Sequence, residues 1–281
     1  MPAKIPQSES RSFERIREHY LIEKELADRL RRATKTERRH LYTTVYDELF
    51  RRVHDHPQLT RKAGAESRAA EVAARLKLLR RYLRPDITYL EVGPGDCSLA
   101  VAVAQQVRKA YAVDVSEEIA AGISLPENLT YVLSDGSNIP VPAGSIDLAY
   151  SDQLLEHLHP DDALAHLEDI YDALAPGGVY VCLTPNRLTG PHDISRYFDE
   201  VATGFHLREY TVGELTQLFR MVGFRKLKVL AGGAGVHAPL PPVLIRMIER
   251  FLTMLPGRFG RTLARGLPLR LILGAKVVAR K

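Results

Sequence analysis

Hydrophobic positions in the first third of the chain recur with the spacing of amphipathic helices. Residues 10–33 form one such pattern, with apolar side chains at or near helical spacing. A Thr-x-x-Glu capping box at residues 34–37 starts a second pattern, which reaches about residue 54. A third pattern covers about residues 64–83 and ends before a proline. The first third of the chain is therefore predicted to be helical.

Beyond residue 85 the pattern changes, and short apolar runs alternate with helical stretches. The expected strands are residues 87–92, 110–115, 129–133, 145–151, 179–184, 224–230 and 271–279. The expected helices are residues 97–107, 116–123, 161–175 and 212–222, with a Pro-Gly-Gly turn at 176–178. Strands that alternate with helices indicate βαβ units. We therefore expect an α/β fold with a doubly wound, mostly parallel, seven-stranded Rossmann-like sheet.

We expect two helical additions to this sheet, one at the N-terminus and one inserted before the last strand. Residues 1–60 form an N-terminal helical extension or lid, and residues 61–281 form the main domain with a helical insert at about 231–266. The insert combines prolines with an apolar segment and interspersed arginines. We expect it to cover the sheet or to form a homodimer face. The alternative is that residues 239–265 are a basic amphipathic element that contacts a membrane surface or a lipid-linked substrate.

The composition is that of an ordinary globular protein. Of the 281 residues, 45% are hydrophobic and 26% are charged, which excludes a wholly disordered chain. The sequence has no apolar run long enough for a membrane-spanning helix and no apolar core of a secretory signal at its start. The two cysteines lack metal-ligand spacing. We expect a cytoplasmic protein, peripheral contact with the inner membrane surface being the alternative, and we assign no metal ligands.

Charge is segregated along the chain, although the net charge is only +5. Residues 1–85 carry a net +9, residues 86–205 carry −15 and residues 206–281 carry +11. Solvated helix faces and attraction within the fold account for such blocks, and we favour this interpretation. An anionic partner near the two basic flanks is the alternative.

A glycine turn follows the first expected strand, in the sequence Tyr-Leu-Glu-Val-Gly-Pro-Gly-Asp-Cys at residues 89–97. Such a turn lets backbone N–H groups approach a ligand closely, and ligands of open α/β sheets bind beyond the carboxyl ends of the strands. A dinucleotide-binding turn would carry a third glycine, where this chain has Ser98. The turn therefore predicts a nucleotide-like ligand other than NAD.

Acidic residues lie at the ends of three successive expected strands. Glu91 precedes the glycine turn, Asp114 ends the second strand, and Asp135 with Gly136 follows the third. An acid at the position of Asp114 can accept hydrogen bonds from both ribose hydroxyls. The other two suit an ammonium group and an adenine amino group. S-Adenosylmethionine carries an ammonium, a ribose and an adenine and has no phosphate, which agrees with the net −15 of this segment.

The ordered set of motifs resembles the class I S-adenosylmethionine-dependent methyltransferases, in the group of the ubiquinone-biosynthesis O-methyltransferases. The matching segments are residues 90–96, 112–116, 134–158, 174–187, 206–215 and 222–224. The resemblance implies a transferase of the EC 2.1.1 type, active in biosynthesis, with S-adenosyl-L-methionine as cofactor and S-adenosyl-L-homocysteine as product. It covers residues 86–230 and leaves the N-terminal extension and the insert outside.

The resemblance also assigns cofactor-binding residues. These are Glu91, Gly93, Gly95, Asp114, Val115, Asp135, Gly136, Ser151, Asp152 and Gln153. The first three would hold the methionine part and Asp114 the ribose. Asp135 and Gly136 would hold the adenine, and the last three would line the side of the methyl group.

A hydroxyl acceptor must lose its proton during methyl transfer, which calls for a general base. The candidates are His157, in a Glu-His pair after the fourth strand, His192 and Asp193, in a Pro/Gly-rich loop after the fifth, and His206. Packing or capping roles for these side chains are the alternative. Asp152, His192 and Asp193 could meet around a divalent metal, although their spacing alone does not show it.

The sequence leaves several functions open. The favoured one is methyl transfer to a hydroxyl of a small molecule, a glycan or a lipid-linked substrate. Alternatives are a small-molecule N-methyltransferase and a nucleic-acid methyltransferase or RNA binder that uses the basic flanks. A nucleic-acid partner is not favoured, because the flanks lack an RNA-binding motif and an aromatic platform. A scaffold that kept the fold is not favoured either, because it would have no need of the three acids.

Overall fold

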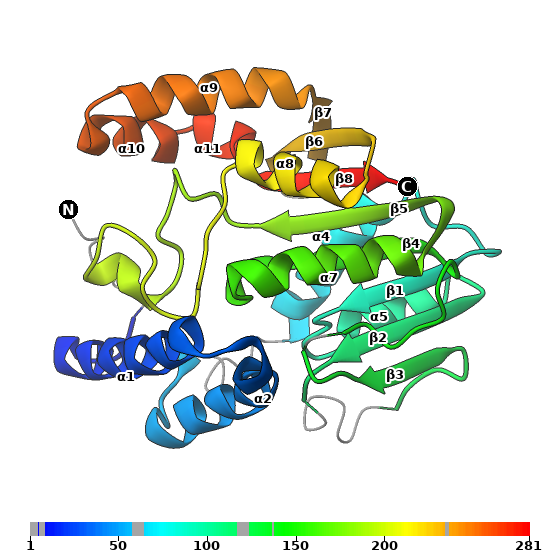
Figure 1. The fold of residues 1–281 in the computed structure, drawn as a ribbon, viewed down its shortest axis with the longest axis horizontal. Coiled ribbons are helices and arrows are strands. Elements are labelled where there is room, and N and C mark those ends of the chain that lie inside the picture. Colours follow the sequence, from blue (N-terminus) through cyan, green and yellow to red (C-terminus); the bar gives the residue numbers. More distant parts are fainter. Residues whose placement is uncertain (1–4, 6–8, 58–64, 117–123, 137, 234–235) are drawn as a thin grey trace.

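The computed structural model places a twisted sheet through the middle of the molecule (Figure 1). It describes residues 5, 9–57, 65–116, 124–136, 138–233 and 236–281. Among these residues, eight strands pair in the order β3-β2-β1-β4-β5-β8-β6-β7. The strands are β1 (Thr88–Val92), β2 (Lys109–Asp114), β3 (Leu129–Leu133), β4 (Ile146–Asp152), β5 (Leu174–Thr184), β6 (Lys226–Gly233), β7 (Val236–Leu240) and β8 (Ala275–Arg280). The first five are parallel, and β8 is antiparallel to both β5 and β6.

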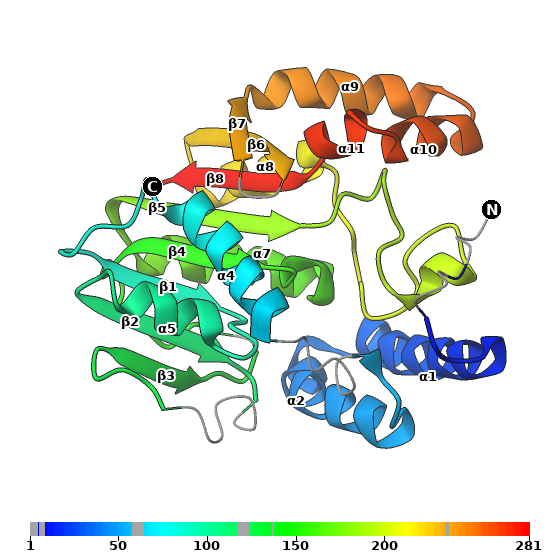
Figure 2. The same ribbon diagram turned by 180° about the vertical axis from the view of Figure 1, so that it is seen from behind.

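Helices cover both faces of the sheet, as Figures 1 and 2 show from opposite sides. On one face lie α7 (Pro160–Ala173) and α8 (Val212–Val222), and on the other lie α4 (Ala65–Leu79) and α5 (Ser98–Ala104). All five residues of β1 are buried, as expected of a parallel strand covered on both sides. Tyr89 contributes to the core under α4 and α5, and Leu90 to the core on the opposite face.

Two helices of the N-terminal extension lie beyond the carboxyl ends of the first strands (Figure 1). They are α1 (Phe13–Arg32) and α2 (Lys35–Arg52). The predicted capping box is confirmed, because Thr34 and Glu37 bond each other's backbone N–H groups at the start of α2. The position of α2 matters for function, because it covers the strand ends where ligands of such sheets bind.

A buried ion pair holds α2 against the start of α7. The Arg38 guanidinium contacts both oxygens of Asp162, from Nε at 2.5 Å and from Nη2 at 2.8 Å. Tyr42 donates its hydroxyl to the same carboxylate at 2.9 Å and accepts from the backbone N–H of His159. The charged pair is satisfied by several hydrogen bonds, as a buried pair must be if it is to be tolerated.

The prediction of seven strands is wrong by one, since β7 adds an antiparallel edge strand within residues 231–266. Pro239 belongs to β7, where a position on an edge strand tolerates its missing N–H. The rest of this insert is helical as expected, with α9 (Pro242–Met254), α10 (Gly257–Arg265) and, just beyond it, α11 (Leu269–Ile272).

The Pro-Gly-Gly segment at 176–178, expected to be a turn, lies within β5. A register shift between Ile146 and Leu148 of β4 accommodates it, so the strand starts earlier than the apolar run. The helix expected at 116–123 lies, apart from its first residue, outside the described residues. No helix in the described part of the chain is long and apolar enough to cross a membrane.

We predict that Asp162→Asn destabilises the protein by about 3–5 kcal/mol, because it leaves the Arg38 charge buried without its partner. Urea unfolding followed by circular dichroism measures this free energy. The neighbouring Asp161 is a matched control, since its side chain is 77% exposed, and Asp161→Asn should cost less than about 1 kcal/mol. Equal effects of the two substitutions would contradict the anchoring role.

Candidate active site

A cavity of about 470 Å³ lies at the carboxyl ends of β1 and β2, underneath α2. Its walls come from α2, from the segments after β1, β2, β3 and β4, and from α7. The residues that line it include Tyr42, Tyr46, Phe50, Gly93, Asp114, Val115, Gly136, Asn138, Gln153, Leu154, His157 and His166. A cavity at this edge of a doubly wound sheet is the expected place for a nucleotide-like ligand.

Two glycines bring the backbone to the cavity wall. Gly93 has φ +70° and Gly136 has φ +78°, a conformation that glycine adopts readily. A Cβ on Gly136 would lie 3.2 Å from Tyr42 and 3.3 Å from Val115. The wall at this point therefore has room for backbone but not for a side chain.

Asp114 lies at the end of β2 and presents one carboxylate oxygen to the protein. Its Oδ1 accepts the backbone N–H groups of Val115 at 2.7 Å and Ser116 at 3.3 Å. Its other oxygen, Oδ2, has no hydrogen bond among the described residues and can accept from a ligand. Burial raises the pKa of this carboxyl, while the two N–H groups oppose that rise.

Glu91 and Asp152 lie outside the lining of this cavity. Glu91 is buried, accepts the hydroxyl of Tyr89 at 3.2 Å, and has its pKa raised to about 8 by burial. Asp152 pairs with Arg75 of α4 at 2.8 Å and accepts from Tyr150 at 3.1 Å. Their cofactor roles stay predictions, and in the structure both face the α4 side of the sheet.

The other predicted cofactor residues divide between the cavity wall and its surroundings. Val115 and Gly136 line the cavity, whereas Gly95 does not, and a Cβ added at Gly95 would meet no atom within 4 Å. Ser151 is buried, 2.7 Å from the hydroxyl of Tyr180, and Asp135 is exposed. At the end of β4, Gln153 reaches the cavity as predicted.

His157 lies in the short helix η1 (Leu155–His157) and lines the cavity. Its Nδ1 is 3.0 Å from the hydroxyl of Tyr46 and 3.1 Å from the carbonyl oxygen of Phe205. Burial lowers the pKa of His157 to about 3, so the ring is neutral at physiological pH. With Nδ1–H directed at the carbonyl, the lone pair is on Nε2.

Glu156 and His206 lie next to His157 and form a buried group with it. One ligand atom from each of the three residues lies within 4.8 Å of those from the other two. The Glu156 carboxylate accepts from Thr184 at 2.9 Å through Oε2, and burial raises its pKa to about 7. His206 is buried, which lowers its pKa, but its hydrogen bond to Glu209 and nearby acids raise it overall.

His192 and Asp193 do not line the cavity but hold the segment that carries His206. The backbone N–H of His192 donates to Glu209 Oε1 at 2.7 Å, and the same oxygen lies 2.8 Å from His206 Nδ1. Asp193, at the start of η2 (Ile194–Tyr197), accepts from the backbone N–H of Gly204 at 2.9 Å. Asp152, His192 and Asp193 are not among the groups of described residues whose side chains lie close enough together to hold a metal ion.

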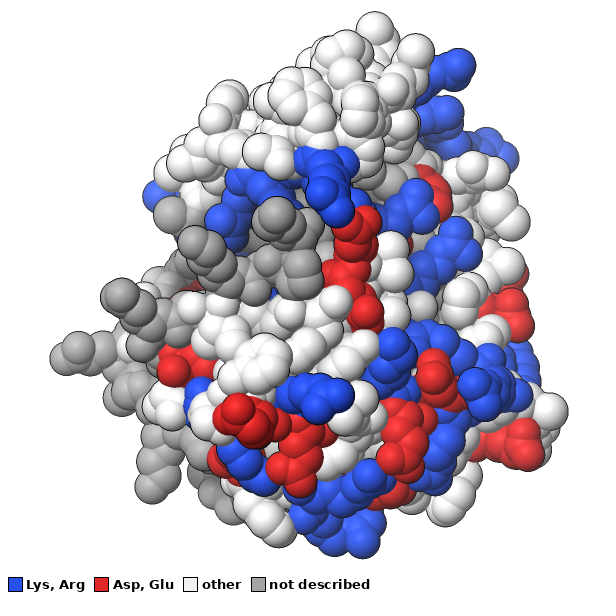
Figure 3. Space-filling view, turned by 90° about the vertical axis from the view of Figure 1, so that its left-hand side faces the viewer, with Lys and Arg blue, Asp and Glu red and all other residues white. Residues whose placement is uncertain are grey.

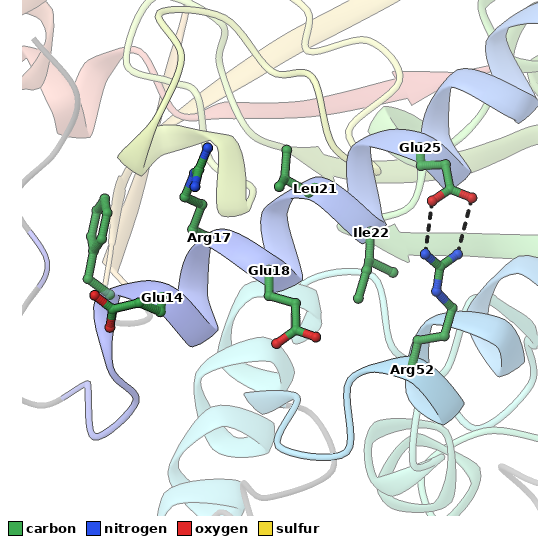
Figure 4. A pocket seen from close by; sticks show the side chains of 8 residues that line it. Glu14, Arg17, Glu18, Leu21, Ile22, Glu25 and Arg52 are labelled. Atoms are coloured by element: carbon green, nitrogen blue, oxygen red, sulfur yellow. Dashed lines mark hydrogen bonds and ion pairs between the residues drawn. The ribbon is translucent and has the colours of Figure 1, made fainter.

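A separate hollow of about 680 Å³ lies along α1 and contains none of the predicted site residues. Figure 4 shows that charged side chains line it, with Glu25 paired to Arg52 of α2. Its lining residues bring no glycine turn and no strand end to it, so we assign it no part in the site.

Residues 65–229 match a family described as "Methyltransferase domain". This match covers more than half of the 281 residues and includes every residue of the cavity wall from Gly93 to His166. The chain belongs to this family.

Curated relatives of this methyltransferase agree. A protein from Mycolicibacterium smegmatis, named "Probable S-adenosylmethionine-dependent methyltransferase", is 30% identical over 136 residues, which are 48% of this chain and 51% of the relative. A Mycobacterium tuberculosis protein with the same description is 30% identical over 48% of this chain and 47% of its own length. The chain thus spans about half the length of the curated relatives that it matches.

Solved structures share the fold at low sequence identity. A chain from the complex of the Haloferax volcanii Trm112 methyltransferase activator with a methyltransferase has a TM-score of 0.53 at 17% identity, over 78% of this chain and 92% of that one. An S-adenosylmethionine-dependent methyltransferase from Archaeoglobus fulgidus has a TM-score of 0.50 at 18% identity, over 75% and 94%. The fold is therefore one that S-adenosylmethionine-dependent methyltransferases have.

The cavity residues of this methyltransferase fit that cofactor. Asp114 offers to ribose hydroxyls a carboxylate oxygen that has no hydrogen bond among the described residues, and Gly136 lets the backbone itself form the wall beside Tyr42 and Val115. His166 of α7 adds a buried Nε2 that has no hydrogen-bond partner among the described residues. Burial lowers the pKa of His166 to about 4, so a neutral imidazole faces the cavity.

Sequence reasoning assigned no function to several residues of the wall. Tyr42 and Tyr46 are four residues apart on one face of α2, a spacing that favours core packing over a lid role; they pack in the core and also line the cavity. Asn138 lies in the matching segment 134–158 but received no role, and His166 carries no motif. The residues that match the family, 65–229, include the strand ends that line the cavity, whereas α2 lies outside them.

We predict that Asp114→Ala weakens binding of S-adenosylhomocysteine by about 1–3 kcal/mol, because a carboxylate hydrogen bond to the ribose is lost. Isothermal titration calorimetry measures the dissociation constants. Asp86→Ala, at an exposed acid outside the cavity, is the control and should bind as the wild type does. Unchanged affinity of Asp114→Ala would remove this residue from the cofactor site.

Proposed function

We propose that this methyltransferase transfers the methyl group of S-adenosylmethionine to a hydroxyl oxygen of a small-molecule, glycan or lipid-linked acceptor. The observation that carries the proposal is that one cavity is lined by both Asp114, which suits a ribose, and His157, which belongs to a group able to receive a proton or positive charge. The fold supplies the donor site, and His157 with its neighbours supplies the acceptor end.

S-Adenosylmethionine supplies a methyl group on a positively charged sulfur, which an acceptor oxygen displaces in line. The protein contributes proximity and alignment, which are worth up to roughly 7–11 kcal/mol in favourable systems. Tyr42, Tyr46 and Phe50 of α2 cover the cavity and keep water from it. These contributions need no nucleophile on the protein.

A hydroxyl acceptor also loses its proton as the oxygen–carbon bond forms. His157 alone would be a weak base, because a base is most effective when its pKa is near the working pH, and burial lowers this pKa to about 3. Glu156 and His206 are its immediate neighbours. We therefore assign the removal of the proton to the three residues as a unit, in place of one histidine or aspartate.

A second feature supports a lipid-linked acceptor. Helices α9 and α10 and the segment after them expose apolar side chains at Val243, Leu244, Met247, Phe251, Met254, Phe259, Leu263, Leu267 and Leu271. Exposed arginines accompany them at positions 246, 250, 258, 265 and 270. Figure 3 shows this largely uncharged surface at the top of the molecule, with Lys and Arg beside and below it. An apolar face bordered by cations suits the surface of an anionic membrane.

The basic N-terminal flank gives less support to a nucleic-acid partner. Arg29 pairs with Glu48 at 2.6 Å, Arg52 pairs with Glu25 at 2.9 Å, and Arg15 pairs with Asp55 at 2.9 Å. Figure 3 shows both signs of charge interspersed over this lower part of the molecule. Such pairing lowers the number of cations on α1 and α2 that are available to phosphates.

We predict that His157→Gln lowers kcat by about 10²- to 10⁴-fold, because the acceptor end loses a member that handles the proton. A screen of hydroxylated acceptors by release of S-adenosylhomocysteine, with NMR of the product, identifies the substrate for this measurement. His40→Gln, at an exposed histidine of α2, is the control. Both variants should bind S-adenosylhomocysteine within about threefold of the wild type. A product methylated on nitrogen or carbon would contradict the hydroxyl acceptor.

We predict that the double variant Met247→Asp, Phe251→Asp abolishes co-sedimentation with vesicles of anionic phospholipid, because charges enter the apolar face of α9. Leu21→Asp places a charge at a similarly exposed apolar position on α1 and should leave co-sedimentation intact. Size-exclusion chromatography accompanies the assay. A wild-type dimer that the double variant dissociates, without vesicle binding by either protein, would instead identify this surface as a homodimer face.

A further inference from the structure

Three buried side chains beside the cavity have the donor set of a metal site. Glu156 offers a carboxylate, and His157 and His206 offer imidazoles, with one ligand atom of each within 4.8 Å of the others. The two imidazole rings are perpendicular, with centroids 4.9 Å apart. Glu156 and His206 are buried, and His157 connects the group to the cavity.

In each histidine, Nδ1 already lies within hydrogen-bond distance of a protein oxygen, as is typical of the nitrogen that does not bind the metal. His157 Nδ1 is held at 3.1 Å from the carbonyl oxygen of Phe205, and His206 Nδ1 at 2.8 Å from Glu209 Oε1. Metal-ligating histidines almost always donate their other N–H to a carbonyl or carboxylate, which fixes the tautomer and aims the free nitrogen at the ion. Among the described residues, Nε2 of neither ring has a hydrogen bond, whereas Nδ1 of both is bonded.

The carboxylate provides an independent observation. Glu156 Oε2 accepts the hydroxyl of Thr184, but Oε1 is fully buried and has no hydrogen-bond partner among the described residues. A buried, unpaired carboxylate oxygen is costly, and a bound cation would remove that cost. The unpaired oxygen belongs to the same group as the two free nitrogens.

A second cluster in the described part of the chain differs from this one, because the ring nitrogens of one of its histidines already have hydrogen-bond partners. His19, Glu23 and His56 also lie within ligand distance of one another. There, however, Arg11 donates to His19 Nδ1 at 3.0 Å and His19 Nε2 bonds Glu23 at 3.0 Å. Both nitrogens of that histidine are taken, so no lone pair remains for a cation.

We propose that Glu156, His157 and His206 bind one divalent transition-metal cation of the Zn²⁺ type. Two imidazoles and one carboxylate suit Zn²⁺ better than Mg²⁺ or Ca²⁺, which prefer all-oxygen sites. Ligand atoms of a tetrahedral Zn²⁺ site lie roughly 3.3 Å apart, given Zn–ligand distances of about 2.0–2.1 Å. Because the three ligand atoms lie within 4.8 Å of one another, binding requires them to approach by at most about 1.5 Å.

The proposal deepens the proposed function, on which its catalytic consequence rests. Three protein ligands leave the fourth position of a tetrahedral ion open, as catalytic zinc sites do. Because His157 lines the cavity, the open position would be reached from the acceptor side. A hydroxyl bound there would have a lowered pKa and would release its proton to water; with the ion bound, the three residues serve as its ligands and no longer as the proton acceptor.

Calorimetric titration of untagged, chelator-treated protein with Zn²⁺ tests the proposal without cofactor or acceptor. We expect one Zn²⁺ per chain. Loss of a residue that hydrogen-bonds a metal ligand typically weakens metal binding 10- to 100-fold, and we expect Glu209→Gln to fall in that range. We expect Glu156→Gln and His206→Gln, which remove ligands themselves, to weaken binding by at least as much. His40→Gln should bind Zn²⁺ as the wild type does. Circular dichroism checks that each variant is folded.

Two results would overturn the proposal. The first is a folded wild type that binds no stoichiometric Zn²⁺, which would mean that water fills the space between the three side chains. The second is binding that Glu156→Gln and His206→Gln leave unchanged, which would place the ion elsewhere on the surface. Binding of S-adenosylhomocysteine, measured on the same preparations, tells failure of the metal site apart from failure of the methyltransferase assignment.

Discussion

The buried ion pair between Arg38 and Asp162 is the constraint on which the site depends. It ties α2, which the methyltransferase family match does not include, to α7, which that match does include. Two turns of α2 then lie over the strand ends, with Tyr42 against Gly136 and Tyr46 at His157. A parallel sheet alone leaves its carboxyl edge open to water. Here the ion pair holds α2 over that edge, where it forms one wall of the cavity, and burial of His157 lowers its pKa.

A second layer of hydrogen bonds fixes the acceptor end of the cavity. Asp193 holds the backbone at Gly204, and Phe205 offers its carbonyl to His157. Glu209 joins the backbone of His192 to the ring of His206. The loop after β5 therefore acts through position and not through contact with the cavity. Its backbone and polar groups orient the rings of His157 and His206.

Much of the fold and part of the cavity wall could be predicted from the sequence, because parallel strands and glycine turns have recognisable local sequence patterns. The strand Leu129–Leu133 and the helix Val212–Val222 have their predicted bounds. Asp114, Gly93 and Gly136 line the cavity because the position of each at a strand end is set by the fold. Glu91 and Asp152 lie within the last residues of β1 and β4, and the alternation of side chains along a strand directs them to the α4 face, where they bond Tyr89 and Arg75.

What the sequence could not predict depends on contacts between distant segments. The group of Glu156, His157 and His206 joins residues separated by about 50 positions, and no spacing rule connects them. Tyr42 and Tyr46 cover the cavity because the ion pair between Arg38 and Asp162 holds α2 in place. These two paired residues are 124 positions apart in the sequence. The edge strand β7 was missed because its prolines resemble a loop, and only its place at the edge of the sheet makes them acceptable.

The most direct test of the account is a crystal structure of the protein grown with S-adenosylhomocysteine. The account predicts the ribose hydroxyls at Asp114, the adenine between Gly136 and His166 beneath Tyr42, and the sulfur directed toward His157. A ligand bound in the hollow along α1, or in the cavity with its sulfur directed away from His157, would contradict it.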